Sequence, residues 1–445
     1  MTVHTFFTPL LLALNFIYFS TSAIAAESEV DSRNSEPWTV QRSVSFALTN
    51  SPDIKIAQQK ILLARANKNQ AESSLYPWLS VGARYAQTDT PMYSFGNILN
   101  QGEFDNTIDF NDPGRSDNLG LTADLRYRLY SGGRDRAGIN AAAAHENAAD
   151  QQLEALHNGL AFGVVHGFYS IMQAEEIVQA NKSAIEAIEA SLNAAKARFE
   201  AGTLLKVDLL DLELQKSLAN ENLIQASHNL DLVKQGFINL LGLESTDISI
   251  APDDTTKPAI PAELHPDHRP ELKSLDAMIE STRAGVEQAR SANYPSINAF
   301  GTYQYDKGFE YEGSGNSWTA GVSLNQNIFD GYQTSAAIAA AEAQLADALE
   351  QKRKMLLAIK LEIEKASLGI KQAEQRLSVT ETMVSQATER ARLSRERFKE
   401  GVILTSDLID VENRLTDATV RRTVAKAARR IAIADLRRAV GLEQF

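Results

Sequence analysis

The sequence predicts a mixed fold in which long α-helical hairpins are joined to a membrane-spanning set of β-strands, with the whole arrangement occurring twice. Three observations predict it. The phrase RFEAGTLLKVDLLDLE in residues 198–213 returns in residues 397–412 as RFKEGVILTSDLIDVE. Each copy also contains two segments in which apolar and polar residues alternate. In each copy a long proline-free segment with helical periodicity follows them.

The repeat extends well beyond this phrase. Residues 51–85 match residues 269–303, and both segments contain the dipeptide Tyr-Pro in register. Two copies of so long a unit are too few for a solenoid and indicate an internal duplication. We therefore expect a first repeat, a proline-rich linker and a second repeat, over residues 26–244, 245–268 and 269–445.

The N-terminal residues 1–25 predict a secretory signal peptide. An apolar run from Phe6 to Phe19 precedes Ala23-Ile24-Ala25, which has the small-x-small pattern of a cleavage site. A membrane anchor is the alternative, but the run is short and is interrupted by Pro9 and Asn15. The chain contains no cysteine, so its core must hold without disulfides. Its net charge of −13 argues against nucleic acid as a partner.

Each repeat is expected to open with a helix, over residues 52–76 and 271–293. Apolar residues such as Ile54, Ile61 and Ala64 fall mostly at helical spacing. Pro77 and Pro295 end these segments because proline cannot continue a helix.

Four segments then change to a period of two, over residues 79–88, 119–130, 297–305 and 318–329. Alternation with charge on one face only is typical of a strand in a membrane barrel. A half-buried hairpin of a soluble protein has the same alternation. The export signal and the aromatic residues near the strand ends favour the membrane. The loops at residues 89–118 and 306–317 are polar, as external loops would be.

After the strands the period is helical again. Long helices are expected over residues 134–200 and 332–399, and shorter helices return over 206–240 and 405–440. Glycines mark the bends where strand becomes helix, because glycine permits backbone angles that a side chain forbids: Gly132, Gly133 and Gly331.

The first long helix also contains Gly159, Gly163 and Gly167, four residues apart. They predict either the close approach of another helix or a locally weakened helix.

Four strands cannot close a barrel on their own. A sheet edge facing lipid leaves N–H and C=O groups unpaired at a cost of several kcal/mol each. If the strands span a membrane, the β-barrel must therefore be assembled from several protomers, each contributing four strands. Two protomers would give eight strands and three would give twelve, and the polar faces favour the wider, wetter lumen.

In these features the chain resembles the TolC-like outer-membrane efflux protein (outer membrane factor) family. The resemblance rests on Tyr-Pro before each first strand, on Gly-Gly or Asp-Gly after each second strand, and on the repeated phrase at each hairpin. It implies a homotrimer with a twelve-stranded barrel in outer-membrane lipid of a Gram-negative bacterium. A long α-helical barrel would cross the periplasm, with the linker in an equatorial belt. Members of the family are passive exit ducts that dock onto a periplasmic adaptor (membrane fusion) protein bound to an inner-membrane pump.

The resemblance places the repeated phrase at the hairpin tips. The tips would contact the adaptor through Gly202, Thr203, Leu204, Leu205, Gly401, Val402, Ile403 and Leu404. The periplasmic gate of the family falls on Asp407 and Asp410, with Asp208 and Asp211 at the equivalent places of the first copy. These carboxylates are alternatively helix-start acids favoured by the helix dipole. The family's closed state can be tied by a tyrosine and an arginine near the second tip. Phe398 and Ile403 stand there instead, so that tie does not carry over.

Other functions find little support in the sequence. His145-Glu146 begins like a zinc-binding HExxH motif, but Ala149 stands where the second histidine is needed. We expect no enzyme activity, no cofactor and no metal site. The duct would serve multidrug efflux or type I secretion, through a pump of RND, ABC or MFS type, and the cargo does not follow from the sequence. A secreted coiled-coil structural protein or adhesin without a pore is the alternative.

Overall fold

The computed structural model of the protein describes residues 37–244, 248–251 and 259–445. The expected signal peptide lies outside the described residues, as do residues 245–247 and 252–258 of the expected linker. All helices and strands of the described part belong to one unit, Trp38–Phe445.

Both halves of this unit contain a helix, two strands, a long helix and a shorter helix in the same order, and the first half contains two further helices. The first half contains α1 (Val40–Asn50), α2 (Pro52–Glu72), β1 (Trp78–Thr88), α3 (Pro91–Asn100), β2 (Ser116–Tyr130), α4 (Arg134–Glu200) and α5 (Lys206–Leu241). The second half contains α6 (Pro270–Arg290), β3 (Ser296–Lys307), β4 (Ser314–Asn325), α7 (Gln333–Lys399) and α8 (Thr405–Ala439). Both long helices, α4 and α7, have 67 residues, and the helices α2 and α6 have 21 each.

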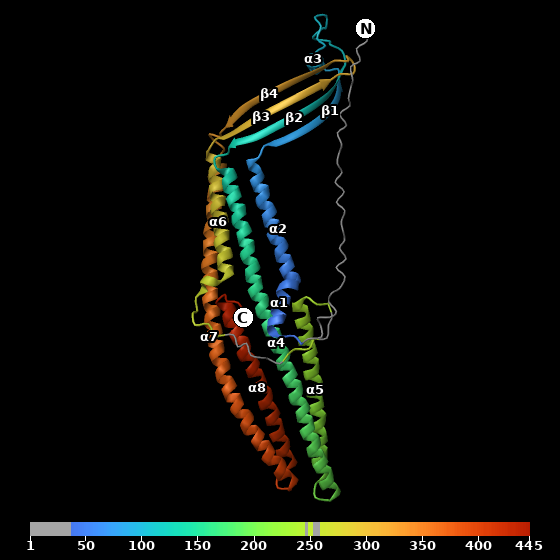
Figure 1. The fold of residues 1–445 in the computed structure, drawn as a ribbon, viewed down its shortest axis with the longest axis vertical. Helices are drawn as coiled ribbons and strands as arrows, with labels where there is room; N and C mark the ends of the chain where they lie inside the picture. Colours follow the sequence, from blue (N-terminus) through green and yellow to red (C-terminus); the bar gives the residue numbers. More distant parts are fainter. Residues whose placement is uncertain (1–36, 245–247, 252–258) are drawn as a thin grey trace, which may run out of the picture. The chain divides into compact units, whose positions relative to one another are not determined.

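The strands lie at one end of the unit and the two hairpin turns lie at the other (Figure 1). The short helices α2 and α5 follow one another along α4, and α6 and α8 follow one another along α7 (Figure 1). At 1.5 Å per residue, each long helix extends over about 100 Å. Each long helix thus packs along its length against two shorter helices placed end to end.

The four strands form one antiparallel sheet in the order β1-β2-β3-β4. The pairing of β2 with β3 joins the hairpins of the two halves, with Asp124 opposite Thr302 and their side chains hydrogen-bonded at 2.7 Å. Among the residues that the structure describes, strands β1 and β4 each have a partner strand on one side only. The sheet of one chain therefore ends in two open edges.

The fourth strand differs from its expected bounds of residues 318–329. It covers Ser314–Asn325, so Ile328 and Phe329 follow the strand and are largely exposed. The strand begins earlier because Ser314 pairs with Lys307 through the main chain, and main-chain pairing does not require an apolar pattern. The expected loop at residues 306–317 is correspondingly shorter.

Two helices were not expected from the sequence. Helix α1 precedes the first repeat helix, and its residues Val44 and Ala47 are buried. Helix α3 lies within residues 89–118, which we expected to be a polar external loop. Pro91 occupies its first turn, where the missing N–H costs nothing, and Ile98 is fully buried.

The glycine series of α4 faces a neighbouring helix at one end. A Cβ on Gly167 would lie 2.9 Å from the ring of Phe237 in α5, whereas one on Gly159 would meet nothing within 4 Å. Of the two interpretations of this series, close helix approach therefore holds at Gly167.

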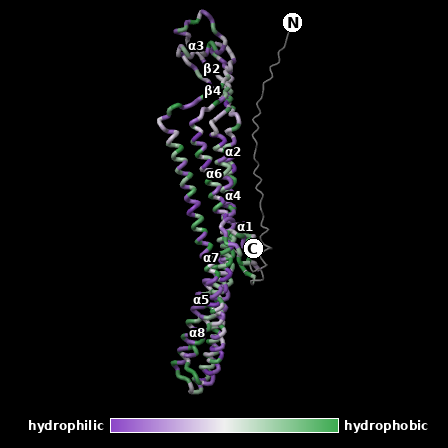
Figure 2. The backbone as a smooth tube through the Cα atoms, turned by 90° about the vertical axis from the view of Figure 1, so that its left-hand side faces the viewer, coloured by the Kyte–Doolittle hydropathy of each residue, from purple (hydrophilic) through white to green (hydrophobic). Residues whose placement is uncertain are grey.

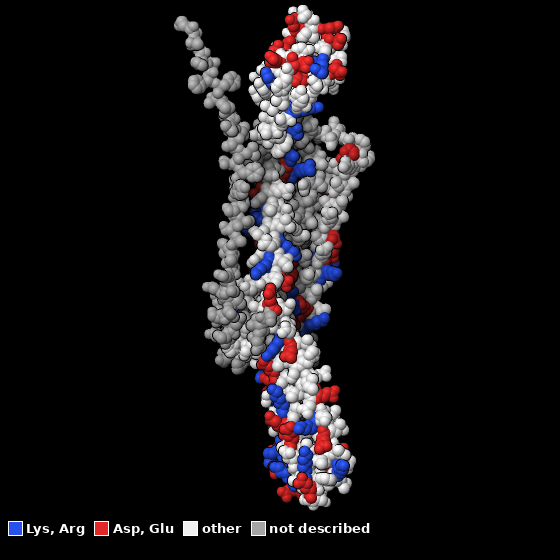
Figure 3. All heavy atoms as spheres, turned by 90° about the vertical axis from the view of Figure 1, so that its right-hand side faces the viewer, with Lys and Arg blue, Asp and Glu red and all other residues white. Residues whose placement is uncertain are grey.

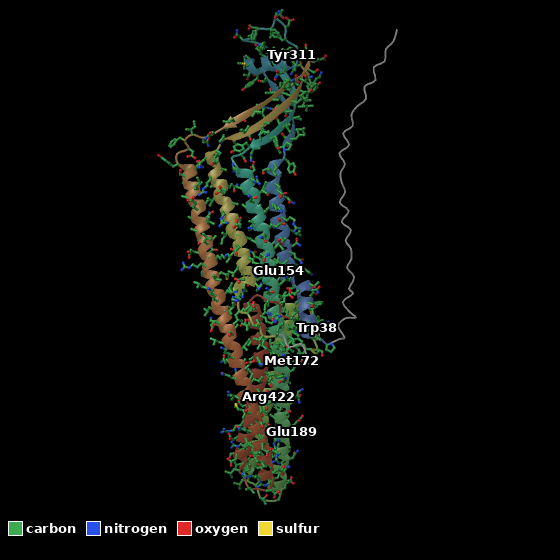
Figure 4. The ribbon with its side chains drawn as sticks, turned by 60° about the vertical axis from the view of Figure 1, so that its left-hand side comes forward. Trp38, Glu154, Met172, Glu189, Tyr311 and Arg422 are labelled. Atoms are coloured by element: carbon green, nitrogen blue, oxygen red, sulfur yellow. The ribbon has the colours of Figure 1, made fainter. Side chains whose placement is uncertain are left out.

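The main hydrophobic core lies at mid-height, where α1 and the ends of α5 and α8 meet α4. Trp38 is 3% exposed and packs its ring against Phe46 at 5.2 Å between centroids (Figure 4). The main chain of Trp38 pairs with Ser249 and Ala251, so a short segment of the linker is fixed to the start of the described chain. This region is called the waist below.

A second contact holds the waist together through buried charge. The Arg269 side chain is 6% exposed, and it binds Glu362 of α7 at 2.8 Å and the carbonyl of Ala439 of α8 at 3.0 Å. Arg438 of α8 binds the same carboxylate at 2.7 Å. Burial disfavours the charged form of Glu362, but the hydrogen bonds and charges of Arg438 and Arg269 outweigh it and hold its pKa below the usual value.

The helices carry polar and apolar residues intermixed along their lengths (Figure 2). None of the helices within the described ranges has a stretch apolar and long enough to cross a bilayer.

The strand-to-helix bend yields the first prediction. Gly132 has φ 64°, and a Cβ there would lie 2.7 Å from both the Ser291 carbonyl oxygen and the Tyr294 Cβ. We expect Gly132→Ala to cost about 2 kcal/mol or more, because a side chain is strained at positive φ and no space is available for it. Gly96→Ala is the control, since a Cβ on Gly96 would meet nothing within 4 Å. Thermal unfolding of both variants tests this, and equal melting temperatures would contradict it.

The second prediction concerns pH. Because its folded pKa is depressed, Glu362 contributes stability above the ordinary glutamate range and loses it as the pH falls through the folded pKa. We expect Glu362→Gln to lower the melting temperature at pH 7 and to flatten its further decline below about pH 4. Glu350→Gln removes an exposed partner of Arg353 and should change little at either pH. An unchanged acid decline in Glu362→Gln would refute the assignment.

Candidate functional site: the two hairpin tips

Both hairpin tips are built by the same backbone motif. Helix α4 ends at Glu200, Gly202 adopts φ 77°, and the N–H groups of Gly202 and Thr203 donate to the carbonyls of Phe199 and Arg198. In the second tip Gly401 has φ 76°, and Gly401 and Val402 make the equivalent bonds to Phe398 and Arg397. A glycine is required here because this helix ending needs a left-handed residue. The repeated Arg-Phe-x-x-Gly phrase thus encodes a tight helix stop followed by a new helix.

The apolar tip residues divide into two groups. Leu205, Val402 and Leu404 are each about 70% exposed. Leu204 and Ile403 instead pack against a small core between the hairpins. Only the first group forms an accessible apolar surface at the turns.

The second acidic pair lies on the surface just after the tip. Asp407 and Asp410 are both exposed and line a groove between α7 and α8 together with Arg390 and Arg397. Asp410 also binds Arg414 one helical turn later, at 2.8 Å.

The first acidic pair is placed similarly at the start of α5. Asp208 is half-buried in its first turn, and Asp211 is exposed. Each acidic pair therefore lies near its own tip.

Across the part of the chain that the structure describes, no group of three or more His, Asp or Glu side chains is placed to hold a metal ion.

A small apolar core joins the two tips. Phe398 and Leu408 of the second hairpin are each 1% exposed and pack against Leu192, Ala195 and Leu212 of the first. Gln215 of α5 adds a hydrogen bond of 2.6 Å to Asn413 of α8. The position of the acidic groove on α8 therefore depends on how the second hairpin packs against the first.

A charged contact stiffens the second hairpin just above this core. Arg395 of α7 binds Glu412 of α8 through both of its carboxylate oxygens, at 2.5 and 2.6 Å. Glu412 is 6% exposed, and the hydrogen bonds that it accepts raise the pKa of Arg395. Sequence reasoning missed this pair, because nothing in the repeat distinguishes Glu412 from its exposed counterpart Glu213.

At the opposite end of the unit, the loops are strongly acidic (Figure 3). Asp105, Asp109 and Asp112 are exposed, as are Glu310 and Glu312 of the β3–β4 loop. Tyr311 lies at this end and donates to the carbonyl of Pro113 (Figure 4).

A family model and several known proteins are similar to this chain over most of its length. A family model described as outer membrane efflux protein matches residues 43–243 and 265–442. The chain is 21% identical to the probable efflux pump outer membrane protein TtgC of Pseudomonas putida, over 85% of this chain and 78% of that one. It is 24% identical to the cobalt-zinc-cadmium resistance protein CzcC of Cupriavidus metallidurans, over 67% and 72% respectively.

A solved structure has the same fold. The outer membrane channel CmeC of Campylobacter jejuni superimposes with a TM-score of 0.80, covering 91% of this chain and 86% of that one at 18% identity.

The packing between the tips yields the third prediction. Phe398→Ala empties the centre of the tip core and is expected to cost about 3–5 kcal/mol. Phe199→Ala removes the same side chain from the equivalent position of the first copy, where the ring is 39% exposed, and should cost about 1 kcal/mol or less. Limited proteolysis at the tips with thermal unfolding measures both, and equal losses would show that the core does not join the hairpins.

Proposed function

The chain belongs to the outer membrane efflux protein family, and we propose that it forms the outer-membrane exit duct of a tripartite export system. The observation that carries this proposal is the combination of two open sheet edges with two long helical hairpins in one chain. On this proposal residues 26–244 and 269–445 are the two structural repeats, and residues 245–268 are the equatorial linker.

The open edges support assembly as a ring. Strand β4 of one copy runs antiparallel to strand β1 and could pair with β1 of the next, which would satisfy the main-chain groups that lipid cannot. This contact joins two different surfaces, so it generates a closed ring where the rotation from copy to copy adds up to a full turn. With three copies the ring would have twelve strands and a water-filled lumen.

The helices carry matching unpartnered surfaces. On α5, one face exposes Val207, Leu210, Leu214 and Leu218 at spacings of three and four residues. On α7, one face exposes Val379, Met383 and Leu393, at distances along the chain from the second tip similar to those of the α5 residues from the first. These helices lie on opposite sides of the helical layer (Figure 1), so that α5 of one copy would meet α7 of the next. Exposed apolar stripes of this length support burial against another copy of the chain.

In this trimer the duct is passive and its partners supply the energy. No nucleotide-binding signature occurs in the sequence. The exposed tip residues Leu205, Val402 and Leu404 would contact a periplasmic adaptor, bound in turn to an inner-membrane pump of RND, ABC or MFS type. The strands would lie in outer-membrane lipid and the helices would extend into the periplasm.

The gate is proposed to be acidic. Asp407 and Asp410 of three copies would form two carboxylate rings at the periplasmic mouth, with Asp208 and Asp211 nearby. Rings of carboxylates attract cations at a constriction. The alternative role, favourable interaction with the helix dipole, applies to Asp407 and Asp208, which lie in the first turns of their helices.

The cargo stays open between multidrug efflux and type I secretion. The relatives are described by different exports, one as a probable efflux pump protein and another as a cobalt-zinc-cadmium resistance protein. A secreted coiled-coil protein without a pore has no support from these relatives.

The fourth prediction tests the duct and its gate together. Purified protein in a planar bilayer should conduct ions with a small unitary conductance that divalent cations block from the periplasmic side. Asp407→Asn with Asp410→Asn should raise the conductance several-fold and weaken the block, because the carboxylates that bind the cations are gone. Asp417→Asn, an exposed change farther along α8, is the control.

Two outcomes would count against the proposal. A bilayer that never conducts would refute the duct. Conduction with unchanged conductance and block in the double variant would refute only the gate.

A further inference from the structure

Arg198 links the two hairpin tips through a contact that the family resemblance does not assign. It lies at the end of α4, in the first hairpin, and is half-buried. Its Nη1 donates to the carbonyl oxygen of Phe398 at 2.9 Å, and its guanidinium carbon lies 5.3 Å from the centre of the Phe398 ring. One side chain thus holds both the backbone and the ring of a residue in the other hairpin.

The position of the Arg198–Phe398 contact at a helix C-terminus strengthens it. Phe398 is in the last turn of α7, at the negative end of the helix dipole, and its carbonyl oxygen, which already accepts from the Gly401 N–H, can accept a second hydrogen bond. A guanidinium there gains a charge-assisted hydrogen bond, the attraction of the dipole and the attraction of the aromatic face.

Only one of the two possible Arg–Phe contacts between the described tip residues is made, although the repeat supplies an arginine and a phenylalanine in each hairpin. Arg397-Phe398 is the counterpart of Arg198-Phe199 in the repeat. Phe398 is 1% exposed beneath Arg198, whereas Phe199 is 39% exposed. Arg397 is exposed and lines the groove of the acidic pair instead. The contact between the tips is therefore made by the arginine of the first hairpin and the phenylalanine of the second.

Gly401 leaves room for the guanidinium. A Cβ on Gly401 would lie 3.1 Å from Nη2 of Arg198, closer than most side-chain contacts allow. Glycine is needed at this position for its positive φ, and here it also lets Arg198 reach the end of α7.

We propose that Arg198 is a positioning residue that braces the second hairpin against the first and thereby holds Asp407 and Asp410 at the closed periplasmic mouth. The inference rests on the proposed function as a gated duct. Phe398 and Ile403 stand where the family can use a tyrosine and an arginine, and the brace supplies a tie from the other hairpin. Because α7 and α8 turn at Gly401, a change in the contact at Phe398 moves the start of α8, where both aspartates lie.

The test measures opening in a planar bilayer. Arg198→Met keeps a long apolar stem but removes the hydrogen bond and the charge. We expect the fraction of time spent in high-conductance states to rise about tenfold, as when one of two states loses a charge-assisted hydrogen bond. Arg198→Lys keeps the charge without the planar guanidinium and should rise less, and it carries the test if Arg198→Met fails to assemble. Arg353→Met removes an exposed arginine of α7 far from the tip and should match the wild type.

A covalent crosslink between the hairpins distinguishes a positioning role of Arg198 from a direct effect of its charge. The chain has no cysteine, so Gln215→Cys with Asn413→Cys introduces a single pair, at side chains that are 2.6 Å apart in the native contact. Bridging this pair with a short thiol crosslinker should return Arg198→Met to wild-type closure. Reduction of a cleavable crosslinker should open it again.

The outcomes separate the brace from the duct. If the wild type conducts and Arg198→Met opens no more often, the brace is wrong while the duct stands. If Arg198→Met opens more often but the crosslink does not close it, the residue acts through its charge and the brace is likewise overturned. If no preparation conducts, the duct fails and the brace fails with it.

Discussion

The need to pair every main-chain N–H and C=O group of the sheet constrains how the rest of this molecule is arranged. Four antiparallel strands satisfy one another except at the outer edges of β1 and β4, where no further strand of the described residues pairs with their N–H and C=O groups. In lipid such groups must be paired by protein. With the strands in outer-membrane lipid, as we propose, assembly with further copies would follow from this constraint, and the apolar faces of α5 and α7 lie on the two sides of the helical layer where those copies would meet.

Along the helices, the contacts between the hairpins are extensive at the waist and few at the tips. At the waist, a large core and the cluster of buried Arg269 with the partly buried Glu362 and Arg438 tie α7 and α8 to the rest of the unit. Toward the tips the joint between the hairpins narrows to a small core, one amide hydrogen bond and the contact of Arg198 with Phe398. A movement of the second hairpin would therefore begin at the tips, where the fewest contacts must break.

Much of this fold could be predicted from the sequence, because its signals are local and occur twice. The two long helices begin and end within a residue of their expected bounds, since proline-free helical periodicity runs up to a glycine stop. Helix α3 was missed because it is short and lies among polar loop residues. The bounds of β4 were wrong because main-chain pairing begins at Ser314, before the alternating pattern, and stops at Asn325, before that pattern does. The asymmetry of the tips could not be predicted at all. Arg198-Phe199 and Arg397-Phe398 are the same dipeptide, and only tertiary packing buries Phe398 and exposes Phe199. The roles of the acidic pairs at the tips are still a prediction.

The number of chains in the assembled particle tests the central constraint most directly. The mature protein, extracted from membranes in mild detergent, can be weighed by native mass spectrometry after the detergent is stripped in the gas phase. A particle of three chains that loses its subunits only together with its β-structure is the result expected here. A stable single chain that retains its four-stranded sheet in water without detergent would contradict the account, because its open edges would then need neither lipid nor a second copy.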